Sequence, residues 1–195
     1  MIVTYRQGRK NDCRKIAELN YIASEGAIEY LFHNLVPNMT AKDVLSYGLE
    51  KDVYPHSYKS TIVAENEGQI VGSALSYPAK FHCITAELKK FLSANRLDHF
   101  RSFYLSRVEG SYFLDAICVL SKYRKKGIGK SLFEHTKKKA LSNGCHELSL
   151  IEFSDNKKAI KFYRENRFEQ VKSIDLKPHK LIPHNEGCVL MKCAL

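Results

Sequence analysis

The sequence lacks the features that mark several classes of protein. No stretch approaches the roughly 18 uninterrupted apolar residues of a membrane-spanning helix, and the opening MIVTYRQGRK has no apolar core of a signal peptide. A hydrophobic fraction of 44% and a charged fraction of 27% are typical of soluble globular proteins and not of disordered or collagen-like chains. We therefore expect a soluble, cytoplasmic protein without a membrane partner, and a length of 195 residues favours a single domain over residues 1–195.

The cysteines also lack the spacing that zinc sites use. None of the six belongs to a CxxC pair, and they are scattered along the chain at Cys13, Cys83, Cys118, Cys145, Cys188 and Cys193. Several lie among apolar neighbours, where a reduced cysteine packs as a small hydrophobic side chain. We expect no bound metal, and a chain of this length does not need a disulfide scaffold.

Positive charge is what the sequence has in excess. Lys and Arg number 31 against 21 Asp and Glu, which leaves a net charge of +10 and predicts attraction to anions. Nucleic acid, anionic lipid and phosphorylated cofactors all fit that charge. Residues 122–169 hold thirteen of the basic residues and six of the acidic ones, so +7 of the +10 lies in this segment.

Hydrophobic periodicity predicts a mixed α/β protein. Turn residues Asn66, Glu67 and Gly68 separate two β-branched runs and indicate a hairpin, and the apolar run 112–120 is typical of a buried strand. Residues 78–110 are interpreted as a helical insertion before this central strand. The predicted strands are 2–6, 61–65, 69–77, 112–120, 147–153, 168–176 and 187–192, and the predicted helices are 12–20, 24–33, a helix capped by Thr40, 128–142 and 156–165.

A basic, glycine-containing loop between the central strand and the next helix is the clearest candidate site. Backbone N–H groups at a helix N-terminus bind anions, and glycine lets a phosphate approach the backbone. The spacing is neither a Walker A loop nor GxGxxG, and the alternative is an ordinary turn with solvated lysines. The loop residues are Arg124, Lys125, Lys126, Gly127, Ile128, Gly129 and Lys130.

This loop resembles the acetyl-CoA signature of the GCN5-related N-acetyltransferase (GNAT) superfamily, Q/R-x-x-G-x-G/A. The resemblance extends to the family's later helix, where Asn156, Ala159, Phe162 and Tyr163 stand at the Asn and A-x-x-F-Y positions, and it is specific over residues 112–170. The family then has Gly-Phe, whereas this chain has Arg167-Phe168. We expect the left-handed residue that ends the helix to shift to Asn166.

The resemblance implies a GNAT-like, mixed, mostly antiparallel sheet flanked by helices, and acetyl-CoA as cosubstrate. It implies that the pantetheine arm pairs with the backbone of Ile117, Cys118 and Val119, in an opening between that strand and strand 147–153, and that the pyrophosphate lies on residues 124–130. Asn156, with Ala159 beside it, would contact the pantetheine, and Tyr163 would point its hydroxyl at the thioester sulfur. The alternatives are an ordinary helix cap for Asn156 and a core role for Tyr163.

The group that deprotonates the acceptor amine has more than one candidate. Asp115 interrupts the apolar strand and is the first, with a structural, hydrogen-bonded carboxylate as the alternative. Glu109 acting through water is another, and some family members need no dedicated base. The acceptor is expected to be a small-molecule or peptide amine recognised by the N-terminal helices, where Tyr21, Glu25, Glu29 and Tyr30 lie, and by the insertion.

The leading hypothesis is an acetyl-CoA-dependent N-acetyltransferase in which a primary amine attacks the thioester directly. A catalytically silent acyl-CoA sensor is the alternative. A basic nucleic-acid-binding module is less favoured, because the sequence lacks the signatures of RRM, KH and zinc-finger modules. The sequence leaves the acceptor and the oligomeric state open, a homodimer included.

Overall fold

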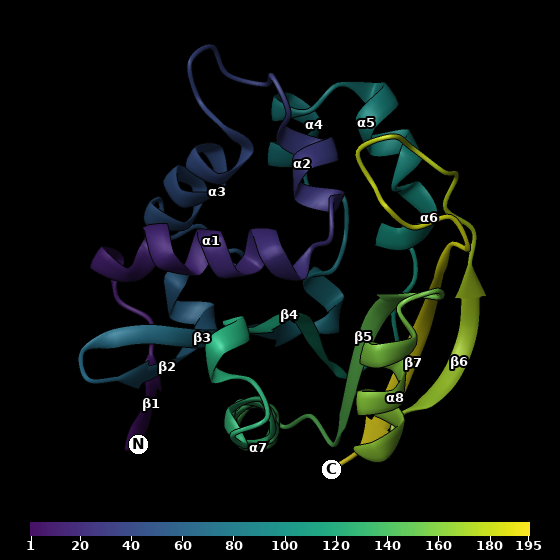
Figure 1. Cartoon of the computed structure of the whole chain (residues 1–195). Helices are drawn as coiled ribbons and strands as arrows, with labels where there is room; N and C mark the ends of the chain where they lie inside the picture. Colours follow the sequence, from purple (N-terminus) through teal and green to yellow (C-terminus); the bar gives the residue numbers. More distant parts are fainter. The chain divides into compact units, whose positions relative to one another are not determined.

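The computed structural model describes residues 1–195, and the chain divides into two compact units. The first comprises Met1–Tyr77 and Leu114–Lys139, and the second comprises Pro78–Phe113 and Ala140–Leu195. Figure 1 traces the elements of both along the chain. The boundary falls within strand β4, which contributes residues to each unit.

The first unit contains four strands, which are β1 (Val3–Gln7), β2 (Thr61–Asn66), β3 (Gln69–Pro78) and β4 (Tyr112–Val119). Of these, β1–β2 and β2–β3 are antiparallel pairs, and β2–β3 is a tight hairpin. The β2–β3 turn has positive φ at Glu67 (49°) and Gly68 (76°), as a two-residue hairpin turn of the primed type requires. Leu120 extends the sheet by donating its N–H to the Val71 carbonyl, 2.9 Å away. The predicted hairpin is confirmed.

The helices of the first unit lie between β1 and β2 and after β4. They are η1 (Lys10–Asp12), α1 (Cys13–Ala23), α2 (Ala27–Phe32), α3 (Ala41–Glu50), η2 (Tyr58–Ser60), η4 (Ser121–Tyr123) and α7 (Ile128–Ser142), whose last residues lie in the second unit. Thr40 and Asp43 form a reciprocal capping box at the start of α3. The expected helix 24–33 begins only at Ala27, because Gly26 is left-handed with φ 102° and cannot continue a right-handed helix.

Buried apolar side chains join these helices to the sheet. Ile16 and Leu19 of α1 and Leu49 of α3 are at most 1% exposed and belong to one cluster with Val63 of β2 and Cys118 of β4. Full burial of such a side chain stabilises the fold by about 1.5–3 kcal/mol. The cluster therefore fixes which face of β4 points towards α1.

The second unit contains a three-stranded antiparallel set and the inserted helices. The strands are β5 (Glu147–Phe153), β6 (Glu169–Ile174) and β7 (Cys188–Ala194), with β7 between the other two. Tyr112 and Phe113 of β4 pair in parallel with Leu148 and Ser149 of β5. The helices are η3 (Ala79–Phe81), α4 (Ala86–Phe91), α5 (Ala94–His99), α6 (Arg101–Tyr104) and α8 (Lys157–Glu165).

The insertion is organised by aromatic packing around a buried histidine. The His82 ring is 1% exposed, stacks on Phe113 at 4.1 Å between centroids and contacts Phe103 and Tyr104. Its Nε2 lies 3.1 Å from the Phe103 carbonyl oxygen. The expected helical insertion is therefore present as short helices that pack against the start of β4.

The end of helix α8 differs from the expectation. Arg167, and not Asn166, is the left-handed residue: its φ is 67°, whereas Asn166 has φ −96°. The Phe168 N–H donates to the Tyr163 carbonyl at 3.0 Å, as in a Schellman motif, which puts the left-handed conformation on the residue before Phe168. Because Phe168 is buried, its position determines the cap, and Arg167 adopts the strained conformation in place of glycine.

In hydrogen-bonded order the strands are β1-β2-β3-β4-β5-β7-β6. The described β1–β2, β2–β3, β5–β7 and β6–β7 pairs are antiparallel, and β4–β5 is parallel. The mixed, mostly antiparallel sheet with flanking helices is as expected. None of the helices combines the length and the apolar composition needed to cross a bilayer.

Candidate functional site

The basic loop of the first unit leads directly into helix α7. Lys125 (φ 59°) and Gly127 (φ 79°) are left-handed, and the first bond of the helix runs from the Ser131 N–H to the Gly127 carbonyl at 3.0 Å. The preceding N–H groups at the start of α7 consequently have no partner within the helix. Together with the helix dipole they favour a negatively charged group at this position.

The side chains of this loop carry positive charge that no carboxylate neutralises. Lys122, Arg124, Lys125, Lys126 and Lys130 are exposed, and none of them forms an ion pair. Lys122 and Lys126 instead hold their ammonium groups 5.0 and 5.4 Å from the centre of the Tyr123 ring. Lysines elsewhere do pair, as Lys161 does with Glu165.

At the end of strand β4, one side chain is buried in the core and one backbone carbonyl is hydrogen-bonded. Cys118 is 6% exposed and packs into the core on the α1 side, where burial raises the pKa of its thiol. The carbonyl of Val119 accepts a hydrogen bond from Arg124 Nε at 2.9 Å. A cofactor could therefore use only backbone groups at Cys118, and the Val119 carbonyl already has a partner.

Asp115 is bound to the neighbouring strand. Its Oδ1 accepts a hydrogen bond from the Tyr77 hydroxyl of β3 at 2.8 Å, and the Tyr77 ring lies edge-on to His56. This bond supports the structural role considered for Asp115, although the carboxylate ties β4 to a strand and not to a loop. Glu109, the other carboxylate considered, lies in the second unit, pairs with Arg107 and has a side chain that is 71% exposed.

Helix α8 positions the candidate residues of the second unit. Asn156 caps it, since its Oδ1 accepts from the Ala159 N–H at 3.2 Å and its Nδ2 donates to Glu152 at 3.3 Å. Tyr163 is 7% exposed, and its ring makes edge contacts with those of Phe162 and Phe168. The structure therefore brings Asn156, Ala159 and Tyr163 together on one helix, while Asp115, Ile117, Cys118, Val119 and residues 124–130 belong to the first unit.

A histidine that sequence reasoning missed lies beside this helix. His184 Nδ1 is 2.5 Å from Asp155 Oδ1, and the ring stacks on Phe153 at 4.1 Å with 12° between the planes. No local pattern marks this pair, because 29 residues separate its members. The two residues come together only in the folded chain, where the antiparallel pairing of β5 with β7 brings the segment before β7 to the end of β5.

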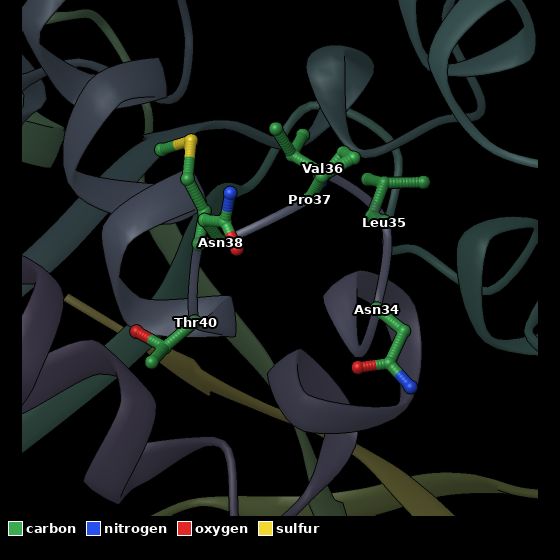
Figure 2. Close-up of a pocket in the computed structure, with 7 residues that line it drawn as sticks. Asn34, Leu35, Val36, Pro37, Asn38 and Thr40 are labelled. Atoms are coloured by element: carbon green, nitrogen blue, oxygen red, sulfur yellow. The ribbon is translucent and has the colours of Figure 1, made fainter.

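The N-terminal helices carry the residues considered for acceptor recognition. Glu29 accepts from the Tyr21 hydroxyl at 2.8 Å and lies 2.7 Å from His33 Nδ1. The hydrogen bond from the Tyr21 hydroxyl to the Glu29 carboxylate raises the pKa of Tyr21. Beyond α2, residues 34–40 surround an open hollow of about 540 Å³, and Figure 2 shows that they form one continuous loop leading to Thr40. The loop contains no charged side chain, and the acidic residues that flank it along the chain are Glu29 and Asp43.

No group of three or more His, Cys, Asp or Glu side chains is arranged to hold a metal ion.

Known structures share this arrangement of strands and helices. An N-acetyltransferase from Staphylococcus aureus Mu50 is 20% identical, with a TM-score of 0.74 over 97% of this chain and 100% of that one. Arabidopsis thaliana Naa50, solved in complex with the bisubstrate analogue CoA-Ac-MVNAL, is 17% identical with a TM-score of 0.59, and both chains are covered completely. A Drosophila melanogaster polyamine N-acetyltransferase, which forms N-acetylagmatine, is 16% identical with a TM-score of 0.66 over both whole chains. The fold is that of the N-acetyltransferases.

The family follows from the sequence itself. The model of the acetyltransferase (GNAT) family matches residues 28–168, which is more than half of the chain. The chain belongs to this family and is an acetyltransferase.

Proposed function

We propose that the protein transfers the acetyl group of acetyl-CoA to a primary amine by direct attack of the amine on the thioester. The observation that carries this proposal is the loop 122–130, whose five cations lack ion pairs and stand where α7 begins. A cofactor with several phosphates would compensate that charge. The same segment matches the cofactor motif of the family, and relatives of known structure were solved with coenzyme A or a CoA-containing analogue.

The loop is proposed to bind the phosphates with its backbone. The N–H groups of Gly127, Ile128, Gly129 and Lys130 would hold the pyrophosphate, with Arg124, Lys125 and Lys126 supplying charge. Ile117 and Cys118 would offer backbone groups to the pantetheine arm, while Val119 contributes through its N–H, because Arg124 occupies its carbonyl. Asn156 and Ala159 would contact the pantetheine at the start of α8.

The proposed reaction needs a neutral amine and a stabilised leaving thiolate. An alkyl ammonium of pKa about 10.4 is mostly charged at pH 7, so forming the neutral nucleophile costs about 4.6 kcal/mol. The leaving thiolate, of pKa about 8.5, accepts a hydrogen bond from a tyrosine hydroxyl, and full proton transfer from a tyrosine of pKa about 10 costs about 2 kcal/mol. Tyr163 is proposed to stabilise the thiolate in this way, as a hydrogen-bond donor more than as an acid.

The assignment of Asp115 as the base stays a prediction. Its Oδ1 is engaged by Tyr77, so a proton would be taken by Oδ2. The acceptor is proposed to be a small-molecule or peptide amine, since structurally similar proteins include a polyamine acetyltransferase and one bound to a peptide-containing analogue.

The direct test is release of free thiol from acetyl-CoA in the presence of a panel of amines: polyamines, lysine peptides and peptides with free N-termini. The expected result is turnover with at least one class, together with binding of CoA in calorimetry. CoA binding without turnover of any amine would instead identify an acyl-CoA sensor, and no CoA binding at all would refute the cofactor assignment.

A further inference from the structure

Strands β1 and β6 are the two edges of the seven-stranded sheet, and β6 is protected against pairing with another chain. Its register shifts between Gln170 and Lys172, so a bulge at Val171 interrupts the edge. It also carries the charged and exposed side chains of Glu169 and Lys172. Bulges and charges, lysine in particular, are common means by which proteins keep an edge strand from joining another sheet.

Strand β1 has none of these protections. Its sequence, VTYRQ, includes no lysine, proline or glycine, and it pairs with β2 in unbroken register from Val3 to Gln7. The one charge of the strand, on Arg6, is compensated by Asp12 and Glu65, each with an oxygen 2.6 Å from a guanidinium nitrogen. A regular edge without uncompensated charge is one that another strand can join.

The backbone groups that point out of this edge follow from the β1–β2 ladder. Gly8, directly after β1, donates its N–H to the Thr61 carbonyl at 2.8 Å. In an antiparallel pair only alternate residues bond to the same neighbouring strand. Counted back in steps of two, Thr4 therefore bonds β2, whereas Val3 and Tyr5 direct their N–H and C=O groups outward.

At the end of the strand, Gln7 is already engaged within the molecule. Its carbonyl accepts a hydrogen bond from Arg6 Nη1 at 3.2 Å, and its side-chain amide donates to the Lys59 carbonyl at 2.8 Å. The stretch of edge that can bond another strand is therefore short and centred on Thr4.

We propose that β1 pairs in antiparallel fashion with β1 of a second copy of this chain, about a twofold axis at Thr4. In this register Val3 of each copy lies opposite Tyr5 of the other, and each such pair exchanges two N–H to C=O hydrogen bonds. The four bonds use every outward backbone group of these two residues. Because the edge satisfies itself in this way, it needs no other kind of chain. The inference is independent of the proposed acetyltransferase function.

The side chains of β1 agree with this register. Thr4 lies opposite Thr4 of the second copy, a cross-strand pair of the kind that stabilises sheets. Ile2, which is 84% exposed, lies opposite Arg6, whose aliphatic stem can cover it. The guanidinium of Arg6 keeps its partners Asp12 and Glu65. No like charges of the strand face each other across the axis.

The size of the contact determines the expected affinity. Strand β1 has five residues, whereas a stable interface uses about 20–30 residues on each side. Association should therefore be weak and reversible, with a Kd on the order of 10–100 µM.

The test is sedimentation equilibrium of the full chain, without an N-terminal tag, from about 2 to 200 µM. The mass of the wild type should rise from that of the monomer towards twice that value. Thr4→Lys places two ammonium groups opposite each other at the axis and should raise Kd at least about tenfold. Val3→Pro removes two of the four hydrogen bonds and should act in the same direction, since proline is tolerated at the first residue of a strand.

A matched variant on the other edge strand is the control. Ser173→Lys introduces the same side chain at an exposed position of β6 and should leave Kd unaltered. Dissociation in Ser173→Lys but not in Thr4→Lys would assign the contact to β6 and overturn the proposal. A wild type that stays monomeric up to about 200 µM would also overturn it, as would an unchanged Kd in both β1 variants.

Hydrogen exchange of the wild type covers the case in which a β1 variant does not fold. The Val3 and Tyr5 amides should exchange about two- to fivefold more slowly at about 200 µM than at about 2 µM, because only the dimer bonds them and its population follows mass action. The Thr4 and Arg6 amides bond β2 in either state and should be protected at both concentrations. Exchange of Val3 and Tyr5 that does not depend on concentration would overturn the proposal.

Discussion

Arg124 folds back onto the strand that precedes it, so that its Nε donates to the Val119 carbonyl at 2.9 Å. The bond uses one of the five N–H donors of the guanidinium and leaves the others for an anion. It also fixes the direction in which the loop leaves β4. One side chain therefore connects the strand proposed for the pantetheine with the loop proposed for the phosphates.

Replacing Arg124 by lysine should weaken cofactor binding more than catalysis. Lysine keeps the charge but lacks a rigid, planar fork that can bond the carbonyl and an anion together. We expect KM for acetyl-CoA to rise by about five- to tenfold with kcat nearly unchanged, a loss of about 1 kcal/mol or slightly more. Steady-state kinetics measures both values. Arg164→Lys, an exposed change on α8, is the matched control and should leave them unaltered.

The unpaired lysines beside Tyr123 should make CoA binding sensitive to salt. Mobile ions screen exposed charges over about 8 Å at physiological ionic strength. We expect the double variant Lys122→Met, Lys126→Met to bind CoA about tenfold more weakly at low salt, and to depend less on salt, in calorimetry from 0.02 to 0.5 M NaCl. Lys161→Met, which removes a lysine paired with Glu165, should match the wild type. Equal salt dependence in all three proteins would exclude these cations from the site.

Tyr163→Phe tests the proposed hydroxyl. The aromatic contacts with Phe162 and Phe168 remain in this variant, so the free energy of unfolding should change by no more than about 1 kcal/mol. Loss of the hydrogen bond to the leaving thiolate should lower kcat about 10- to 100-fold without raising KM for acetyl-CoA. Tyr47→Phe, at a tyrosine that is 55% exposed, serves as control. Undiminished kcat in Tyr163→Phe would assign this residue to the core alone.

Lys139 should make stability depend on pH. Its Nζ donates to the carbonyls of Ser60 and Ser76, and burial lowers the pKa of this ammonium from 10.5 to about 8. Between these values the unfolded chain holds the proton and the folded chain does not, so stability rises with pH across this window. The shift corresponds to about 3 kcal/mol.

The comparison with Lys139→Met isolates this effect from other groups. Urea unfolding at pH 7 to 10.5 should show the wild type gaining about 3 kcal/mol relative to the variant as pH rises. Lys138→Met removes the exposed neighbour and should give a difference that does not change with pH. A flat difference for Lys139→Met would mean that its ammonium stays charged throughout.

The six cysteine thiols should react with a disulfide reagent at different rates. Five of the six cysteines are buried, and Cys83 is the one with intermediate exposure. Burial raises the pKa of Cys13 to about 11 and that of Cys188 to about 12, and the thiolate is the reactive form. Titration with a chromogenic disulfide at pH 8 should therefore modify one thiol rapidly in the native protein and six in denaturant. Rapid reaction of more than two native thiols would contradict this burial.

Elements governed by local patterns could be predicted from the sequence. The turn at Glu67 and Gly68 fixed the hairpin, because few residues tolerate positive φ there. The predicted strand 147–153 has the bounds found for β5. The basic loop at the start of α7 was predictable for the same reason, since its glycines and cations are consecutive in the chain.

Features that depend on distant partners could not be predicted. Tyr77 and Asp115 are 38 residues apart, and their bond follows from the pairing of neighbouring strands. The left-handed residue after α8 was assigned to Asn166 by intrinsic preference, but the burial of Phe168 places it at Arg167. Local propensity gave the wrong residue because tertiary packing outweighs the cost of about 1–2 kcal/mol for a non-glycine residue in that conformation.

Two close contacts divide the connection between β6 and β7 into shorter segments. The His179 ring lies 5.9 Å from that of His99, and a Cβ on Gly187 would come within 2.5 Å of the Ile174 carbonyl oxygen. Each fixed point shortens the length of chain that is free to fluctuate, which lowers its conformational entropy. Added residues should be tolerated beside the exposed Pro178. One residue added between Asp155 and the strand end, or between His184 and Gly187, would move the imidazole out of line with its carboxylate.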